Sequence, residues 1–248
     1  MSIIYAIPTY KRYDIIQSKT LSLLNSYDIP KKDIFIFVAD KKEFKLYKEV
    51  LGDDYKIVVG VLYISKQRNF INNFFKEGQQ IVLIDDDIDE ISELSKTKLK
   101  RLPNLKKFVN DAFAECKDNN AYLWGIYPVN NHYFMRKTIT KDLRFIAGGF
   151  YGIINRKSKD LKLWVEEKED ILKTLQYFVK DGIVIRYNFI GMKTKNYATG
   201  GISANIDRVK SSKSAVEKIN EKYPTLTRIE KPTKTNPHFE IKLMKNKI

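Results

Sequence analysis

Short apolar runs alternate with segments of helical apolar spacing through residues 1–90. The runs Ile3–Ile7, Ile34–Ala39 and Ile81–Ile84 are apolar throughout, which is typical of strands buried on both faces of a sheet. Lys66–Lys76 instead carries its apolar residues at helical spacing. Buried strands separated by helices predict an α/β fold with a mostly parallel central sheet and helices on both faces. The same spacing predicts the other elements of this region, which are helices at Ile16–Ser26 and Glu43–Leu51 and a strand at Ile57–Val61.

The pattern is less regular after residue 100. It predicts three further helices and two further strands, namely helices at Leu105–Cys116, Ile171–Lys180 and Ser214–Tyr223 and strands at Tyr122–Ile126 and Ile183–Tyr187. We predict a hairpin at Asn131–Thr140 and strand-like segments at Phe145–Ile154. The last 25 residues are basic and hold three prolines, which predicts an arm or flexible tail. Without an internal repeat or clear linker, we predict one domain at residues 1–205, with a C-terminal helix and basic arm at residues 206–248 packing on it.

Three consecutive aspartates, Asp85, Asp86 and Asp87, follow the apolar run in "IVLIDDDID". Aspartate is a poor strand former, so the triplet marks the point where the strand leaves the core. In open parallel sheets, ligands bind beyond the carboxyl ends of the strands. Three neighbouring carboxylates repel each other unless a cation neutralises them, as a divalent ion bridging two phosphates and one carboxylate would do. The alternative is an acidic junction in which Asp87 or Asp89 caps a helix that begins near Glu90.

Composition narrows the chemistry of such a site. The 248 residues are 43% hydrophobic, enough to bury a sizeable core. Cys116 is the single cysteine, which excludes a disulfide framework and a cysteine-cluster metal site, and two histidines disfavour an all-histidine zinc site. Any metal is therefore expected to be a hard cation held by carboxylates, Mn²⁺ or Mg²⁺. No apolar stretch approaches a transmembrane length and no signal peptide is evident, so we expect a cytoplasmic protein without membrane association.

Polar residues follow the other predicted strands at the same edge of the sheet. The candidates for this cleft are Pro8, Thr9 and Arg12 in "IPTYKR", Asp40 after "IFIFVA", and Gln67 and Arg68 in "SKQRNFI". An arginine fork at a helix start suits a nucleotide. Each residue also has a purely structural explanation: a turn for Pro8, a helix cap for Asp40 and a solvated cation for Arg68. Their joint placement at strand ends favours a nucleotide site.

These segments resemble a known family. The series "AIPTYKR", "FVAD", "QRNFI", "IVLIDDDI", "GGFYGI" and "EEKED" resembles a GT-A glycosyltransferase and, more closely, the TET-associated glycosyltransferase family. That family includes the base J glucosyltransferase and phage enzymes that glycosylate hydroxymethylated pyrimidines in DNA. The resemblance runs from about Ile3 to about Gly201. The acidic DxD element occurs throughout GT-A enzymes, whereas "QRNFI" followed by an acidic triplet is more specific. The resemblance implies a Rossmann-like GT-A fold, with the C-terminal extension unassigned.

The resemblance also implies roles for a UDP-sugar donor. The residues that would line the uridine pocket are Pro8, Thr9, Arg12 and Asp40, with Gln67 and Arg68 nearby. Asp85 and Asp86 would meet the ribose and the donor sugar, and Asp87 would ligate Mn²⁺ or Mg²⁺. GT-A metal sites often take a C-terminal histidine, for which His238 is the candidate, although its surroundings match no motif of the family.

Two further elements are assigned through the same resemblance. Gly148 and Gly149 would let the backbone approach donor and acceptor closely. Asp170 would be the catalytic base of an inverting enzyme. Its neighbours Glu166, Glu167 and Glu169 would raise its pKa and strengthen it as a base. The alternative for this acidic segment is the first turn of a helix, which the helix dipole favours.

Net charge bears on the acceptor. The formal charge is +15, from 45 Lys and Arg against 30 Asp and Glu, which favours polyanionic partners such as nucleic acid, although an AT-rich genome also inflates lysine. With the resemblance, we expect DNA carrying 5-hydroxymethylcytosine or 5-hydroxymethyluracil. The hydroxymethyl group of a paired base can project into the major groove, whereas a GT-A pocket is deep, so access from the groove and flipping of the base both stay open. A phosphate-contacting rim would come from basic segments at Arg156–Lys162, Lys193–Lys195, Arg208–Lys213 and Lys242–Lys247. Candidate stacking partners are Trp124, Tyr127, Tyr133 and Tyr151, although core packing is the commoner fate of an aromatic residue.

Two alternatives stay open at this stage. One is a GT-A glycosyltransferase that acts on a glycan or a protein, in which case the positive charge attracts an anionic donor or a membrane. The other is a non-catalytic nucleic-acid-binding protein on a GT-A scaffold. The intact aspartates at residues 85–87 and at residue 170 argue against a protein that has lost catalysis.

Overall fold

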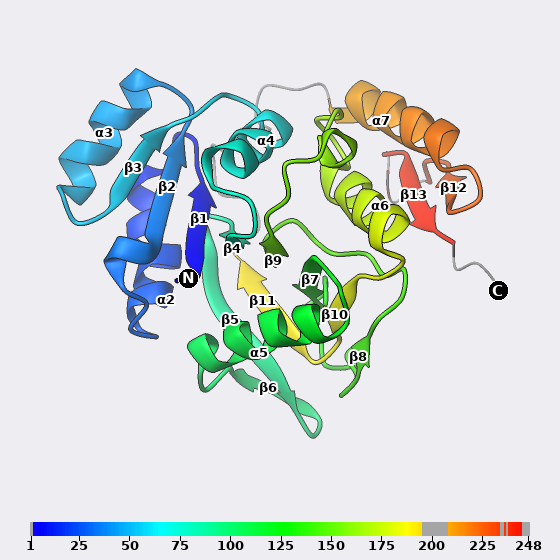
Figure 1. Ribbon diagram of the computed structural model, residues 1–248, viewed down its shortest axis with the longest axis horizontal. Helices are drawn as coiled ribbons and strands as arrows, with labels where there is room; N and C mark the ends of the chain where they lie inside the picture. The colour runs from blue at the N-terminus through cyan, green and yellow to red at the C-terminus, as the bar shows by residue number, and fades with distance from the viewer. Residues whose placement is uncertain (1, 195–207, 234–235, 237, 245–248) are drawn as a thin grey trace.

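The central sheet has eight strands in the order β3-β2-β1-β4-β9-β7-β10-β8 (Figure 1). The computed structural model describes residues 2–194, 208–233, 236 and 238–244. The strands, in chain order, are β1 Ile4–Pro8, β2 Ile34–Val38, β3 Lys56–Val59, β4 Gln80–Ile84, β7 Leu123–Ile126, β8 Ile139–Thr140, β9 Phe150–Ile154 and β10 Ile185–Tyr187. Pairing is parallel from β3 through β2 and β1 to β4, and between β7 and β10. β9 lies antiparallel between β4 and β7, and β8 lies antiparallel to β10.

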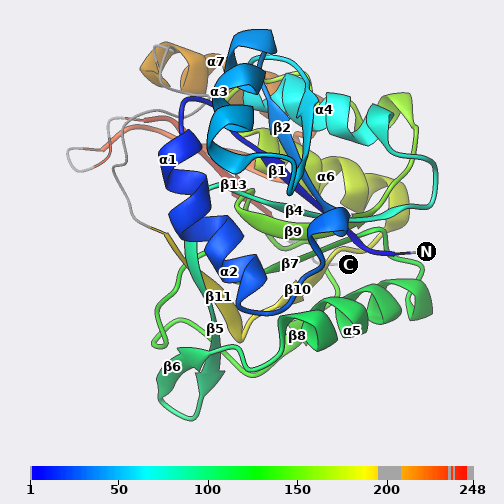
Figure 2. The ribbon, with the colours of Figure 1, turned by 90° about the vertical axis from the view of Figure 1, so that its left-hand side faces the viewer.

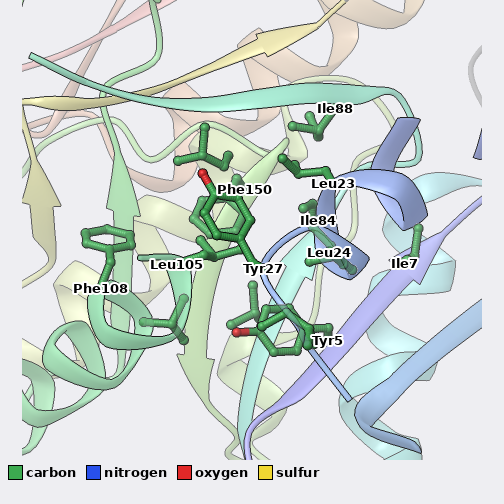
Figure 3. Packing of buried hydrophobic residues seen from close by; sticks show 14 of the residues in the cluster. Tyr5, Ile7, Leu23, Leu24, Tyr27, Ile84, Ile88, Leu105, Phe108 and Phe150 are labelled. Atoms are coloured by element: carbon green, nitrogen blue, oxygen red, sulfur yellow. The ribbon is translucent and has the colours of Figure 1, made fainter. Parts of the chain in front are cut away.

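Helices cover both faces of this sheet (Figure 2). The helices are α1 Tyr13–Ile16, the π-helical η1 Gln17–Leu21, α2 Ser22–Asn25, α3 Lys41–Leu51, α4 Ile64–Phe74, α5 Leu105–Asp118, α6 Glu169–Asp181 and α7 Arg208–Lys222, with 3₁₀ turns at η2 Lys31–Asp33 and η3 Lys159–Leu161. Because side chains alternate along a strand, the two faces form separate cores. Tyr5 and Ile7 of β1 lie in one cluster with residues of α2 and α5 (Figure 3) and of α3. Ile4 and Ala6 lie in a second cluster with residues of α4 and α6. The predicted α/β fold is confirmed.

Two small sheets complete the chain. β5 Ile88–Ser95 pairs antiparallel with both β6 Lys98–Arg101 and β11 Ile190–Thr194. β12 Thr227–Glu230 and β13 Glu240–Leu243 form an antiparallel hairpin. This hairpin and α7 share a third apolar cluster with α6, where Leu172 and Leu175 pack with Val216, Ile219 and Ile241. Within the described ranges, no helix combines the length and the apolar character needed to cross a bilayer.

Several sequence-based predictions are wrong at the edges of the sheet. No helix begins near Glu90, because residues 88–95 form β5. The register with β11 shifts between the partners of Ile88 and Glu90, which is the mark of a bulge, and Ile88 and Ile91, three residues apart, both lie in the same buried cluster. The predicted hairpin at 131–140 is reduced to the two residues of β8, which pair with β10 instead. The predicted flexible tail forms β12 and β13 where the structure describes it.

Trp124 is the largest fully buried side chain of the core. Its ring makes edge-to-face contacts with Phe108, Phe113 and Phe150, each at 5.6 Å between centroids, and such pairs each contribute about 0.5–1.5 kcal/mol. Gly152 lies opposite Trp124 in the pairing of β9 with β7. A Cβ atom at Gly152 would lie 2.1 Å from the indole Nε1, so only glycine fits beneath the ring.

Gly152→Ala is therefore expected to destabilise the fold. The surrounding aromatic rings leave the indole no room to move, so we expect the free energy of unfolding to fall by about 1–3 kcal/mol in urea denaturation, as for overpacked cores. Lys106→Ala, at an exposed position of α5, is the control and should change it by less than about 0.5 kcal/mol. Equal stability of the two variants would contradict this account of the core.

Candidate functional site

A cleft of about 490 Å³ opens at the carboxyl ends of β1 and β4. Six segments of the chain contribute to it: the turn after β1, α4, the aspartate triplet after β4, the segment before β9, the start of α6 with the residues before it, and β11. The lining residues are Pro8, Thr9, Tyr10, Arg12, Ile64, Arg68, Asp85, Asp86, Asp87, Ala147, Gly148, Gly149, Glu166, Glu167, Glu169, Asp170 and Met192. The structure thus brings together ten of the thirteen residues that the sequence singled out, all except Asp40, Gln67 and His238.

Asp86 ties the ends of β1 and β4 together. Thr9 Oγ1 donates to its Oδ2 at 2.6 Å, and Arg12 Nη1 donates to its Oδ1 at 2.8 Å. Tyr47 of α3 contacts the same Thr9 hydroxyl at 2.6 Å. Burial raises the pKa of Asp86, while Arg12 and Thr9 oppose that shift. Because both carboxylate oxygens are engaged within the protein, Asp86 acts here as a structural link between strands.

All three aspartates line the cleft, and Asp85 and Asp87 have more exposed side chains than Asp86. The Asp85 side chain is 39% exposed and lies 3.7 Å from Arg68, and the Asp87 side chain is 17% exposed and contacts Arg12 at 3.2 Å. Burial at the base of the cleft, together with the two neighbouring aspartates, raises the pKa of Asp85 to about 7, although Arg68 opposes the shift. The two carboxylates therefore repel each other, which a cation between them would relieve.

The donor set of this cleft fits a magnesium-type ion that is shared with a ligand. In the described part of the chain, no three histidine, cysteine or acidic side chains already surround one point. Mg²⁺ is usually held by one or two carboxylates together with substrate phosphates and water, and not by a cage of protein ligands. Asp85 and Asp87 supply such a pair of hard oxygen ligands.

Arg68 connects the opposite walls of the cleft. Its side chain is 4% exposed, donates from Nη1 to Glu169 at the start of α6, and donates from Nη2 to the carbonyl of Gly148 at 3.0 Å. A Cβ atom at Gly148 would lie 2.7 Å from the same Nη2. Gly148 therefore permits the close approach of Arg68. This explains the glycine by a contact within the protein, whereas from the sequence we expected it to let a ligand approach.

Asp170 lies in the first turn of α6 and also faces the cleft. Its Oδ1 accepts from the backbone N–H of Ile171 at 2.9 Å. Burial and the neighbouring Glu169 raise the pKa of Asp170 to about 6, while Lys173 and Arg68 oppose the shift. Asp170 therefore both belongs to the acidic first turn of a helix, as the alternative explanation stated, and lines the cleft. A carboxyl group with this pKa is ionised at neutral pH and still a competent proton acceptor.

Lys173, one turn further along α6, was not singled out from the sequence. It is buried, its Nζ lies 3.2 Å from the centre of the Tyr151 ring, and no hydrogen-bond partner is present for this amine among the described residues. Burial and Arg68 lower its pKa well below the usual value. The sequence feature that could have revealed Lys173 is its place beside Leu172, within the apolar part of a predicted helix.

Three predicted residues lie outside the cleft. Asp40 caps α3, where its Oδ1 accepts from the N–H groups of Lys42 and Glu43 at 2.8 and 2.9 Å. Gln67 is fully buried and donates to the carbonyl of Val38 at 3.2 Å, so it supports the end of β2. His238 lies in the connection before β13 and is not among the lining residues. The helix-cap alternative for Asp40 is the one that the geometry supports.

The predicted basic rim and stacking residues are only partly available at the surface. Arg156 is engaged in two hydrogen bonds with Asp181, at 2.8 and 2.6 Å. Trp124 and Tyr151 are buried in the core, whereas Tyr133 is 72% exposed. Lys195, the side chains of residues 208–210 and residues 245–247 lie outside the described residues.

Comparisons with known proteins give the fold and little more. No protein-family model matches the chain, and no curated protein is significantly similar. Among solved structures, a protein titled "Crystal Structure of a Mycobacterial Protein" is 11% identical with a TM-score of 0.53, covering 98% of this chain and 84% of its own. CMP:2-keto-3-deoxy-manno-octonic acid synthetase in complex with CTP is 7% identical with a TM-score of 0.47, and the match covers 90% of this chain and 99% of the synthetase. The first similarity shows a shared fold, and the second is too weak to support an inference.

The strand order, with antiparallel β9 between β4 and β7, and the helices on both faces define an α/β protein with a Rossmann-like, GT-A-type fold. Its cleft lies where ligands bind in open α/β sheets, beyond the carboxyl ends of the strands.

Arg68→Met is expected to destabilise the protein in a pH-dependent way. Without the cation, Glu169 stays largely buried and loses its ion-pair partner, so we expect a loss of about 3–5 kcal/mol in the free energy of unfolding at pH 8. Losing Arg68 raises the folded-state pKa of Asp85 and Asp170 further above their unfolded values. The folded variant therefore takes up protons as the pH falls, and the loss should shrink at pH 5.

Urea denaturation at both pH values measures this effect. Arg228→Met is the matched control, because Arg228 is 58% exposed and contacts Glu230 at 3.4 Å. An exposed pair of this kind contributes at most about 1 kcal/mol, so its loss should be small at both pH values. A loss for Arg68→Met that is the same at pH 5 and pH 8 would contradict the electrostatic account.

Proposed function

We propose that this chain is a metal-dependent glycosyltransferase. It would transfer a sugar such as glucose or arabinose from a UDP-sugar to the hydroxymethyl group of 5-hydroxymethylcytosine or 5-hydroxymethyluracil in DNA. The observation that supports the proposal most is that the acidic pair Asp85 and Asp87 and the candidate base Asp170 line one cleft at the strand ends. A DNA substrate of this kind is consistent with an enzyme of the cytoplasm.

Donor binding would use the side of the cleft formed by β1 and β4. Asp87 together with Asp85 would hold Mn²⁺ or Mg²⁺, and the bound ion would stabilise the negative charge that develops on the departing nucleoside diphosphate. Arg12 orients Asp87 through the 3.2 Å contact and adds positive charge beside the diphosphate. Thr9 and Asp86 fix the strand ends that carry these groups.

Asp170 would act on the acceptor. Its carboxylate would take the proton of the hydroxymethyl group as that oxygen forms a bond to the anomeric carbon, while the bond from this carbon to the diphosphate oxygen breaks. Attack from the face opposite the leaving group gives inversion. Arg68 holds Glu169, the residue before Asp170, and thereby fixes the start of α6 relative to the aspartate triplet.

The acceptor class is tested directly by a transfer assay with labelled UDP-sugar and Mn²⁺. We expect label to enter duplex DNA that contains 5-hydroxymethylcytosine or 5-hydroxymethyluracil, and not unmodified DNA of the same sequence. Excess chelator should abolish transfer, and Asp87→Ala should abolish both transfer and the stabilisation of the fold by Mn²⁺ and UDP, measured as a shift in Tm.

The alternatives give different results in this assay. Transfer to a glycan or a protein but not to DNA would favour the alternative acceptor. Binding of DNA without transfer to any acceptor would favour a non-catalytic binding protein. Full transfer in excess chelator would contradict the proposed metal site but not the proposed acceptor.

Asp170→Asn is expected to lower transfer by roughly 10²–10⁴-fold, the usual contribution of a general base. Binding of UDP, measured by calorimetry, should stay near normal because the amide has nearly the same shape. The wild-type rate should rise with pH through about 6, where the Asp170 carboxyl loses its proton, and this rise should be missing from the variant.

Asp160→Asn provides the matched control, since Asp160 is 77% exposed and contacts Lys180 outside the cleft. It should keep the wild-type rate and pH profile. Near-normal turnover by Asp170→Asn would place the base elsewhere, with Glu169 as the next candidate.

A further inference from the structure

A second cavity, of about 450 Å³, shares Asp170 with the cleft. It is formed by the segment before β9, the start of α6, β10 and the C-terminal hairpin. Its lining residues are Leu143, Arg144, Phe145, Lys168, Asp170, Ile171, Arg186, Glu240, Ile241 and Leu243. The volume lies within the usual range for a bound small ligand. Asp170 therefore faces two spaces, of which the proposed donor site explains only one.

One side of this cavity carries two neighbouring arginines. Arg186 donates from Nε to Asn188 at 2.8 Å and from Nη1 to the carbonyl of Phe145 at 3.2 Å. Arg144 contacts Asp142 at 3.0 Å, and Asp142 also attracts Arg186 electrostatically. Burial and the nearby Arg144 lower the pKa of Arg186, while Tyr127 and Asp142 oppose the shift. Two neighbouring guanidinium groups, with Nε and Nη1 of Arg186 held by neutral acceptors, are a binding arrangement for a phosphate group.

The other side is apolar and comes largely from the C-terminal hairpin. Leu143 and Ile241 are buried in the same cluster, and Phe145 and Leu243 pack against it. Lys168, which precedes α6, pairs with Glu240 of β13 at 2.6 Å and so holds this wall against the start of the helix. In Figure 1 the hairpin lies beside α6 and α7 at one end of the molecule. A planar ring can pack on such a wall while an attached anion meets the arginines.

We infer that this second cavity is the acceptor site and binds one nucleotide unit of a nucleic-acid strand. The phosphate would contact Arg144 and Arg186, and the base would pack between Phe145 and the hairpin, with its hydroxyl group directed to Asp170. A base inside a duplex cannot enter a cavity, so the nucleotide would be flipped out of the stack. This inference rests on the proposed function, and it adds where and how the acceptor is recognised.

Kinetic measurements on arginine variants test the assignment. For Arg144→Gln and Arg186→Gln, we expect the KM for hydroxymethylated DNA to rise about tenfold or more, with the KM for the UDP-sugar unchanged. The log–log salt dependence of DNA binding should fall by about 1 for each phosphate contact that is lost. Leu243→Trp, which fills the cavity without changing charge, should weaken acceptor binding alone. Arg228→Gln, at an exposed arginine outside the cavity, is the matched control and should leave both KM values unchanged.

A second measurement separates failure of the acceptor site from failure of the proposed function. Deoxycytidine 5′-monophosphate is titrated into the wild-type protein and followed by methyl NMR. We expect shifts at Ile241 and Leu243 that Arg186→Gln abolishes, whereas UDP should shift Ile64 and Met192 in the cleft.

The outcomes are distinct. If wild-type protein transfers sugar to DNA but the arginine variants keep a normal KM, the acceptor-site inference is overturned and the function stands. If no transfer to DNA occurs, the proposed function falls and the titration decides the cavity. Mononucleotide shifts at the hairpin then support a nucleotide site, and their absence at millimolar concentration overturns it.

Discussion

The convergence of negative charge on one cleft is the constraint on which the rest of this structure depends. Asp85, Asp86, Asp87, Glu169 and Asp170 approach one another although they come from segments more than 80 residues apart. Two arginines make this arrangement possible: Arg12 binds Asp86 and Asp87, and Arg68 binds Glu169 and lies near Asp85. Each arginine therefore joins elements as well as charges. Gathering these carboxylates in one pocket is electrostatically costly, and the proposed cation with its anionic ligand would offset that cost.

The central sheet was predictable because its strands are buried on both faces. Runs such as 34–39 and 81–84 have no polar residue to compete with the core, so their sequence alone indicates a strand. The edges were not predictable for the opposite reason. In β5, a bulge lets Ile88 and Ile91 lie in one buried cluster although they are three residues apart, a spacing also typical of a helix. β8 consists of two residues whose pairing with β10 depends on tertiary contact. The local pattern of apolar and polar residues does not determine which distant strand a segment pairs with.

The cleft was predictable to the extent that its residues follow strand ends directly. The triplet and Thr9 occupy such places, and parallel strands bring their ends to one edge. Asp40 follows a strand end too, yet its carboxylate caps α3, since the first N–H groups of a helix are the nearest donors. Lys173 and Arg186 could not be assigned from sequence. Their environment is made by Tyr151 in one case and by Arg144 in the other, and both are distant along the chain.

The ion pair between Lys168 and Glu240 spans 72 residues and closes the wall of the second cavity. Chains are synthesised from the N-terminus, and elements fold as they emerge. The sheet, the aspartate triplet and Asp170 are all complete before β13 is made. A ribosome that releases the chain short of the hairpin would therefore leave a protein with its acidic cleft assembled and the neighbouring cavity open on one side. The wall of the second cavity beside Asp170 therefore forms after the acidic cleft.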